Sequence, residues 1–136
     1  MADLPQVTAE GPYESEASPR PEMVFDFEFE EGVLFISLRN IGARPAHDVR
    51  TQVEPPISGL GGRLVLSDSP ILREIPFFAP GKCIRFLFDS SASYFARGEP
   101  TRLTARITWS DGHGNAYTTV NHHDLEIYRM LAWKVR

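Results

Sequence analysis

The sequence has one cysteine and no long apolar run, and these two shortages exclude several classes of protein. Cys83 cannot form a disulfide within the chain, and a single thiol cannot build a zinc site. No stretch approaches the roughly 18 apolar residues of a membrane-spanning helix, so we expect no membrane span. Residues 1–22 also lack the basic start and apolar centre of a signal peptide. This predicts a cytoplasmic protein if Met1 is the native start, and an extracytoplasmic one if the chain is a fragment of a longer protein.

The sequence also lacks an excess of basic residues. Its net charge of −4 comes entirely from residues 1–22, where five acidic residues accompany one basic residue, Arg20. The rest of the chain is neutral, with 13 acidic and 13 basic residues. A neutral body behind an acidic segment offers little attraction to a phosphate backbone. We therefore expect no nucleic-acid partner.

What the sequence does contain is apolar and polar residues in alternation. In residues 23–30, three phenylalanines alternate with acidic residues, which is typical of a half-buried strand. Turn-forming residues such as Glu31-Gly32 and Pro80-Gly81 separate this segment from similar ones. Further strands are predicted in residues 33–40, 48–53, 64–66, 75–78, 84–89, 102–109 and 116–121. This pattern predicts an all-β fold, an immunoglobulin-like antiparallel β-sandwich of about seven to eight strands.

The same pattern predicts three parts of the chain. Residues 1–22 are rich in Pro, Glu, Ser and Ala, which is typical of an extended or mobile lead-in. Residues 23–129 are expected to form the sandwich, and residues 130–136 a C-terminal tail. We expect no helix of useful length, and residues 125–135 are the one stretch whose apolar spacing allows a helix.

Two segments resemble a known family. Residues 38–42, Leu-Arg-Asn-Ile-Gly, and residues 45–49, Pro-Ala-His-Asp-Val, resemble a signature of bacterial immunoglobulin-like domains of the CARDB type and their uncharacterised relatives. The Pro80-Gly81 turn before an aromatic strand and the residues 107–117 are also similar to these domains. The resemblance covers residues 23–128 and implies a spacer, adhesion or docking module that is often extracytoplasmic.

No motif in the sequence is typical of an active site, so we expect a non-enzymatic protein without cofactor or metal. His122 and His123 are neighbours on an expected strand and would point to opposite faces, so they cannot easily share a metal ion. A less favoured hypothesis joins one of them with His113 and Asp124 in a metal-dependent enzyme, but the spacing of the known zinc motifs is absent.

Several large apolar side chains fall outside the expected core faces, and such residues mark partner surfaces when they gather in a patch. The candidate partner-binding residues are Phe35, Phe78, Leu87, Leu131 and Trp133. The favoured function is a protein–protein interaction or docking module that uses sheet edges, the loops 55–72 and 90–100, or the C-terminal tail. Its expected partner is another protein or a second copy of the chain, as a homodimer.

An alternative function is a small-ligand or carbohydrate-binding sandwich. Its stacking platforms would be Trp109, Tyr117 or Tyr94, since aromatic rings beside polar groups in a concave face bind such ligands.

Overall fold

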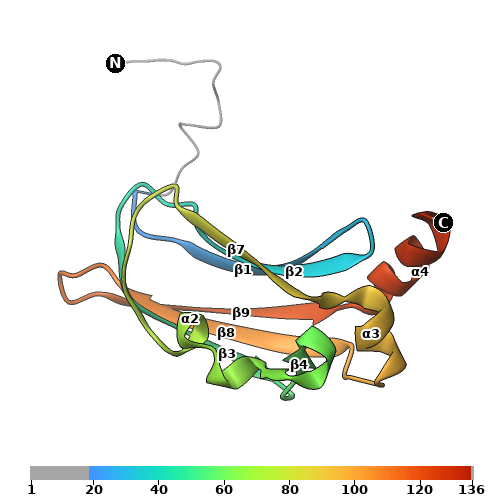
Figure 1. Ribbon diagram of the computed structural model, residues 1–136. Coiled ribbons are helices and arrows are strands. Elements are labelled where there is room, and N and C mark those ends of the chain that lie inside the picture. Colours follow the sequence, from blue (N-terminus) through green and yellow to red (C-terminus); the bar gives the residue numbers. More distant parts are fainter. Residues whose placement is uncertain (1–18, 136) are drawn as a thin grey trace, which may run out of the picture.

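Two antiparallel sheets packed face to face form the protein in this computed structural model, which describes residues 19–135, with side chains for residues 19–131 (Figure 1). The first sheet has the order β1-β2-β7 and contains β1 (Met23–Glu30), β2 (Val33–Asn40) and β7 (Cys83–Ser90). The second has the order β6-β3-β8-β9 and contains β6 (Ile75–Phe78), β3 (Ala46–Glu54), β8 (Arg102–Ser110) and β9 (Ala116–Asp124). This distribution of strands is that of an immunoglobulin-like sandwich, so the predicted all-β fold class is confirmed.

Short helices and strands lie along the second sheet and at one end of the sandwich. A connection between β3 and β6 contains β4 (Ser58–Gly59), η2 (Leu60–Gly62), β5 (Leu64–Val65), η3 (Leu66–Asp68) and α2 (Pro70–Arg73). Figure 1 shows this connection along the second sheet, with α3 (Ser91–Ala96) and α4 (Glu126–Val135) together at the far end. The two helices at that end are in contact.

The core lies between the sheets, and period-two alternation builds it. In β1, Met23, Phe25 and Phe27 are buried, whereas Asp26 and Glu30 are exposed. Burying one such apolar side chain stabilises the fold by about 1.5–3 kcal/mol, so a slip by one residue would turn the whole set outward at great cost. The second sheet contributes the buried side chains of Val49, Leu103, Ala105, Ile107 and Trp109.

Asn40 is the last residue of β2 and stabilises the segment 41–45, which connects the first sheet to β3 in the second sheet. Its side chain is fully buried. The Oδ1 atom accepts hydrogen bonds from the backbone N–H groups of Glu22 (3.1 Å) and Gly42 (2.9 Å). The Nδ2 atom donates to the carbonyls of Arg44 (2.9 Å) and Phe78 (3.1 Å). Asn40 therefore joins three backbone segments at one point: the residues before β1, the turn after β2, and β6.

Gly42 shows why this crossing needs a residue without a side chain. A Cβ atom at Gly42 would collide with the backbone carbonyl of Arg20 and the backbone nitrogen of Glu22. The segment before β1 thus lies directly against the crossing. It is also held by Trp109, whose Nε1 donates to the carbonyl of the buried Pro21 at 3.1 Å.

The predicted division of the chain differs from the structure at one border. α4 begins at Glu126, so a border between residues 129 and 130 falls inside this helix. At the other border, residues 19–22 pack against the sandwich, while residues 1–18 lie outside the described part.

Candidate functional site

The second sheet has an unpaired edge, because β6 covers only part of β3. β6 pairs with β3 at Ala46, His47 and Val49, whereas β8 pairs with β3 as far as Glu54. In the described part of the chain, no hydrogen bond joins the backbone of residues 51–54 to any segment other than β8. An uncovered strand edge carries free N–H and C=O groups that can pair with another chain.

A cavity of about 580 Å³ lies beside this edge, and we call it the β3-edge cavity. It is enclosed by β3 and β8 on one side and by the connection between β3 and β6 on the other. Its apolar lining comprises Val53, Pro56, Ile57, Leu66 and Leu72. Its polar lining comprises Arg50, Thr51, Gln52, Glu54, Ser67, Arg73, Arg106 and Thr108. The volume lies within the range of pockets that hold ligands.

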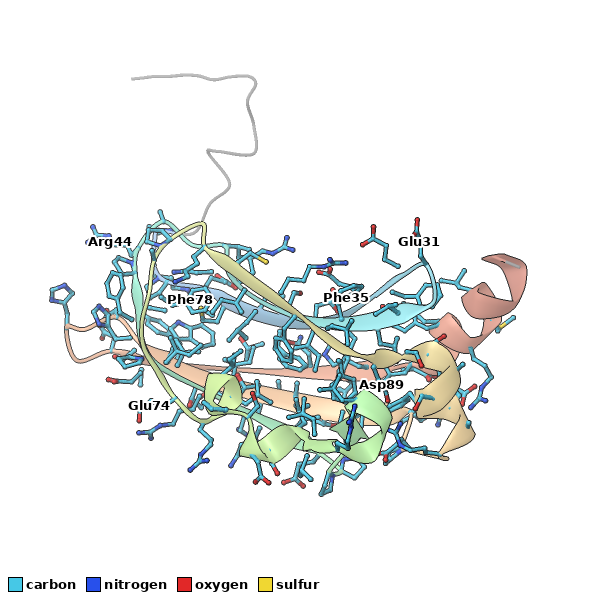
Figure 2. All side chains as sticks on the ribbon, in the orientation of Figure 1. Glu31, Phe35, Arg44, Glu74, Phe78 and Asp89 are labelled. Carbon is cyan, nitrogen blue, oxygen red and sulfur yellow. The ribbon has the colours of Figure 1, made fainter. Side chains whose placement is uncertain are left out.

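A polar network holds the connecting segment near α3. The buried carboxylate of Asp89 accepts from Arg97 Nη1 at 2.8 Å, and Arg97 Nη2 donates to the carbonyl of Ser58 at 2.7 Å. Ser58 in turn donates from Oγ to Glu99 Oε2 at 2.8 Å. Figure 2 shows Asp89 at this end of the sandwich, between the sheet and the connection. The network therefore anchors the start of the connection, directly after the lining residues Pro56 and Ile57.

The charges around the β3-edge cavity are unbalanced. Three arginines line it, Arg50, Arg73 and Arg106, against one carboxylate, Glu54. Arg50 has a weak ion pair with Glu74, at 3.3 Å from Nη2 to Oε2. Neither Arg73 nor Arg106 makes a side-chain hydrogen bond or ion pair with any described residue. The described lining therefore has more positive than negative side chains.

Thr51 adds an unpaired donor to the same cavity. The residue is 6% exposed, and its Oγ1 has no hydrogen-bond partner among the described residues. Most buried polar side chains have a partner, so a buried hydroxyl without one beside a cavity is a candidate ligand contact.

The predicted partner-binding residues do not gather at one place. Phe35 and Leu87 are paired on the outer face of the first sheet, where Leu87 is 48% exposed. The guanidinium of Arg85 lies 3.8 Å above the Phe35 ring and hydrogen-bonds the carboxylates of Glu28 (2.7 Å) and Glu30 (2.8 Å). The Arg85 guanidinium therefore covers one face of the Phe35 ring.

Phe78 is wrongly predicted as a surface residue, since it is fully buried between the sheets. It pairs with the buried Ala46, whereas Phe77 pairs with His47 and is 55% exposed. In the C-terminal helix, Leu131 is 46% exposed, and the side chain of Trp133 lies outside the described part.

The expected stacking platforms are mostly inaccessible. Trp109 and Tyr94 are buried, and the Tyr94 hydroxyl donates to the carbonyl of Pro100. Tyr117 is half-buried, with the Arg20 guanidinium 5.3 Å from its ring centroid. These rings therefore form no exposed aromatic surface for a sugar.

The two neighbouring histidines point to opposite faces of β9. His122 contacts the Thr104 hydroxyl at 3.0 Å on the outer face. The His123 ring packs edge-on against Phe25 and Phe27, and burial lowers the pKa of this imidazole, opposed by the carboxylate of Asp26 at 3.9 Å. Among the described residues, no three His, Cys, Asp or Glu side chains group to hold a metal ion.

The segment 111–115 forms the turn between β8 and β9. Asp111 accepts from the Asn115 side chain at 2.7 Å and from the backbone N–H of His113 at 2.7 Å. These hydrogen bonds hold the pKa of Asp111 at about 2, so the carboxylate is engaged within its own turn.

The sequence indicated the loop 55–72 and the sheet edges as interaction regions, but not the arginines of the β3-edge cavity. Arg73 and Arg106 are 33 positions apart in the sequence and share no motif. Arg106 lies in the predicted strand 102–109, where apolar and polar residues alternate, and an arginine at a polar position indicates only a solvent-facing side chain. Only the packing of the connection against the sheet brings the two side chains to one cavity.

None of the helices in residues 19–135 has the length and apolar character of a bilayer-spanning helix. Neither the curated proteins nor the solved structures include a significant match to this chain. A family model does match residues 7–129, which is most of the sequence. This β-sandwich with an arginine-lined cavity at its β3 edge belongs to the family described as Domain of unknown function (DUF8453).

Proposed function

We propose that the protein is a non-catalytic docking module that binds an extended segment of a partner protein at the β3-edge cavity. The observation that carries this proposal is the stretch of β3 that has no backbone partner on its β6 side, residues 51–54, beside a cavity with an apolar interior. Adding a strand to a free sheet edge is a recurring way to bind a peptide. Main-chain hydrogen bonds supply affinity, and pockets for alternate side chains supply specificity.

The cavity provides both components. The free backbone groups of residues 51–54 can pair with an incoming strand, and alternate side chains of that strand would point inward, toward Leu66 and Leu72. Burying two or three apolar side chains there would add about 1.5–3 kcal/mol each before the cost of ordering the peptide.

The other side of this sheet offers a natural comparison. β9 is also an edge strand, and its exposed residues include Thr118 and Val120. A shallower hollow lies beside β9, and Thr119, Asn121 and His122 line it together with residues of β1. No described residue of the connection between β3 and β6 lines this hollow. We therefore place docking at the β3 edge.

Selection from a displayed library of random peptides tests the proposal. Enriched peptides are then measured against two variants, Ser67→Trp, which fills the cavity from an exposed lining position, and Thr118→Trp, which adds the same bulk at the opposite edge. We expect the affinity to fall at least about tenfold, or about 1.4 kcal/mol, with Ser67→Trp and to stay unchanged with Thr118→Trp.

Two results would refute docking at this site: no enriched peptide, or peptides that bind Ser67→Trp as tightly as the unsubstituted protein. Methylating alternate backbone nitrogens of an enriched peptide provides an independent check, because strand addition needs those N–H groups.

A further inference from the structure

The proposed docking site leaves open which sequences it accepts, and the charges of the β3-edge cavity address this question. Arg50 and Arg106 reach it from β3 and β8, and Arg73 reaches it from α2. Glu54 is the one carboxylate in the lining. Three guanidinium groups from three elements thus surround a space with an apolar interior.

Three arginines elsewhere in the described part are paired at short distance. Arg85 lies 2.7 Å from Glu28, Arg97 lies 2.8 Å from Asp89, and Arg129 lies 2.9 Å from Glu126. Arg73 and Arg106 have no described carboxylate within ion-pair distance, and both line the cavity. A carboxylate is the side chain that a guanidinium binds best, through two parallel hydrogen bonds.

The hydroxyl of Thr51 is a second, independent feature of the same cavity. Thr51 is buried in the second sheet and paired with Ile107, so its side chain faces inward rather than toward solvent. Its Oγ1 has no partner among the described residues, and a hydroxyl can donate to an acceptor that enters the cavity. The cavity therefore offers a hydroxyl donor in addition to its guanidinium groups.

The register of the sheet indicates which side chains of a bound strand would face the arginines. Gln52 is paired with Arg106 on the outer face, whereas Thr51 and Val53 face inward. Side chains of a strand added beside β3 would alternate in the same way. Outward ones would lie beside Arg50 and Gln52, on the same face of the sheet as Arg106, and inward ones would meet the apolar lining.

We infer that the segment bound by this protein is acidic, with carboxylate side chains on alternate residues that pair with Arg73 and Arg106 and apolar side chains between them. This inference rests on the proposed docking function. The ligand class is an extended acidic segment of a partner protein, in which aspartate or glutamate alternates with valine, leucine or isoleucine.

Three synthetic peptides with the same alternating valine frame test the inference, with glutamate, glutamine or lysine at every other position. Binding is measured by fluorescence anisotropy at low and high salt. We expect the glutamate peptide to bind at least about tenfold more tightly than the glutamine peptide, with an advantage that shrinks in high salt. The lysine peptide should bind most weakly.

Variants locate the effect. The double substitution Arg73→Gln/Arg106→Gln should remove the advantage of glutamate over glutamine and leave the glutamine peptide unchanged. The control, Arg63→Gln/Arg102→Gln, removes the same charge from two exposed arginines outside the lining and should keep the advantage.

The outcomes separate the two proposals. Equal binding of the glutamate and glutamine peptides, or tightest binding of the lysine peptide, overturns the inference and leaves docking at the edge intact. A glutamate advantage that survives Arg73→Gln/Arg106→Gln overturns the assignment to these arginines. If none of the three peptides binds and the library selection also fails, the docking function itself is refuted.

Discussion

Replacing Asn40 should cost the fold more than any other single polar substitution described above. In Asn40→Ala, the four hydrogen bonds to Glu22, Gly42, Arg44 and Phe78 are lost together. A buried hydrogen bond contributes about 1 kcal/mol net, so the expected loss is about 3–4 kcal/mol of the free energy of unfolding. Domains of this size are stable by about 5–15 kcal/mol, so the variant would retain only part of its stability.

Asn40→Asp separates the two halves of the side chain. It keeps an oxygen that can accept from the Glu22 and Gly42 nitrogens, and it places a second oxygen against the carbonyls of Arg44 and Phe78. Burial and these carbonyls disfavour the ionised form, so the new carboxyl should titrate above an ordinary aspartate. The stability deficit of Asn40→Asp relative to the unsubstituted protein should therefore shrink as pH falls, whereas the deficit of Asn40→Ala should not.

Urea unfolding followed by far-ultraviolet circular dichroism measures both variants. With a slope of about 2 kcal/mol per molar urea, a loss of 4 kcal/mol lowers the midpoint by about 2 M. A loss below about 1 kcal/mol in Asn40→Ala, or parallel pH profiles for the two variants, would refute the role given to this side chain.

Two further predictions concern close packing and titration. Gly42→Ala should destabilise the protein by about 1–3 kcal/mol, because its Cβ would meet the Arg20 carbonyl, and a thermal unfolding midpoint equal to that of the unsubstituted protein would contradict this. The pKa of His123 is lowered in the folded state, so the unfolded chain binds the proton first as the pH decreases below about 6.5. The free energy of unfolding therefore decreases as the pH is lowered, until the pH reaches the pKa of the folded state. His123→Phe should remove this loss, whose slope is at most about 1.4 kcal/mol per pH unit, and identical pH profiles for the two proteins would contradict it.

Sequence reasoning succeeded where one face of a strand is buried and the other is wet. In β1 and β8 the apolar side chains occupy every second position, so both the strand and its inward face could be predicted. In β6 the adjacent Phe77 and Phe78 are equally apolar, and their own pattern does not reveal which turns inward. The answer depends on pairing with Ala46 and His47 across the sheet.

The C-terminal helix could be located from the sequence, whereas the β3-edge cavity could not. α4 begins at Glu126, one residue after the start of the stretch 125–135 whose apolar spacing allows a helix, and the Asp124 side chain accepts from the backbone N–H of Glu126 at 3.0 Å. The cavity has no local signal, because it depends on where β6 begins. α2 occupies the residues before Ile75, so that strand is too short to cover β3.

The contact between Pro21 and Trp109 bears on how this domain can be joined to other chains. A shorter gene that starts at β1 would remove the carbonyl of Pro21 that accepts the hydrogen bond of Trp109, and it would leave the space beside Gly42 empty. Fusion junctions and expression boundaries should therefore lie upstream of Pro19, since the four residues before β1 pack against the end of the sandwich and belong to the folded unit.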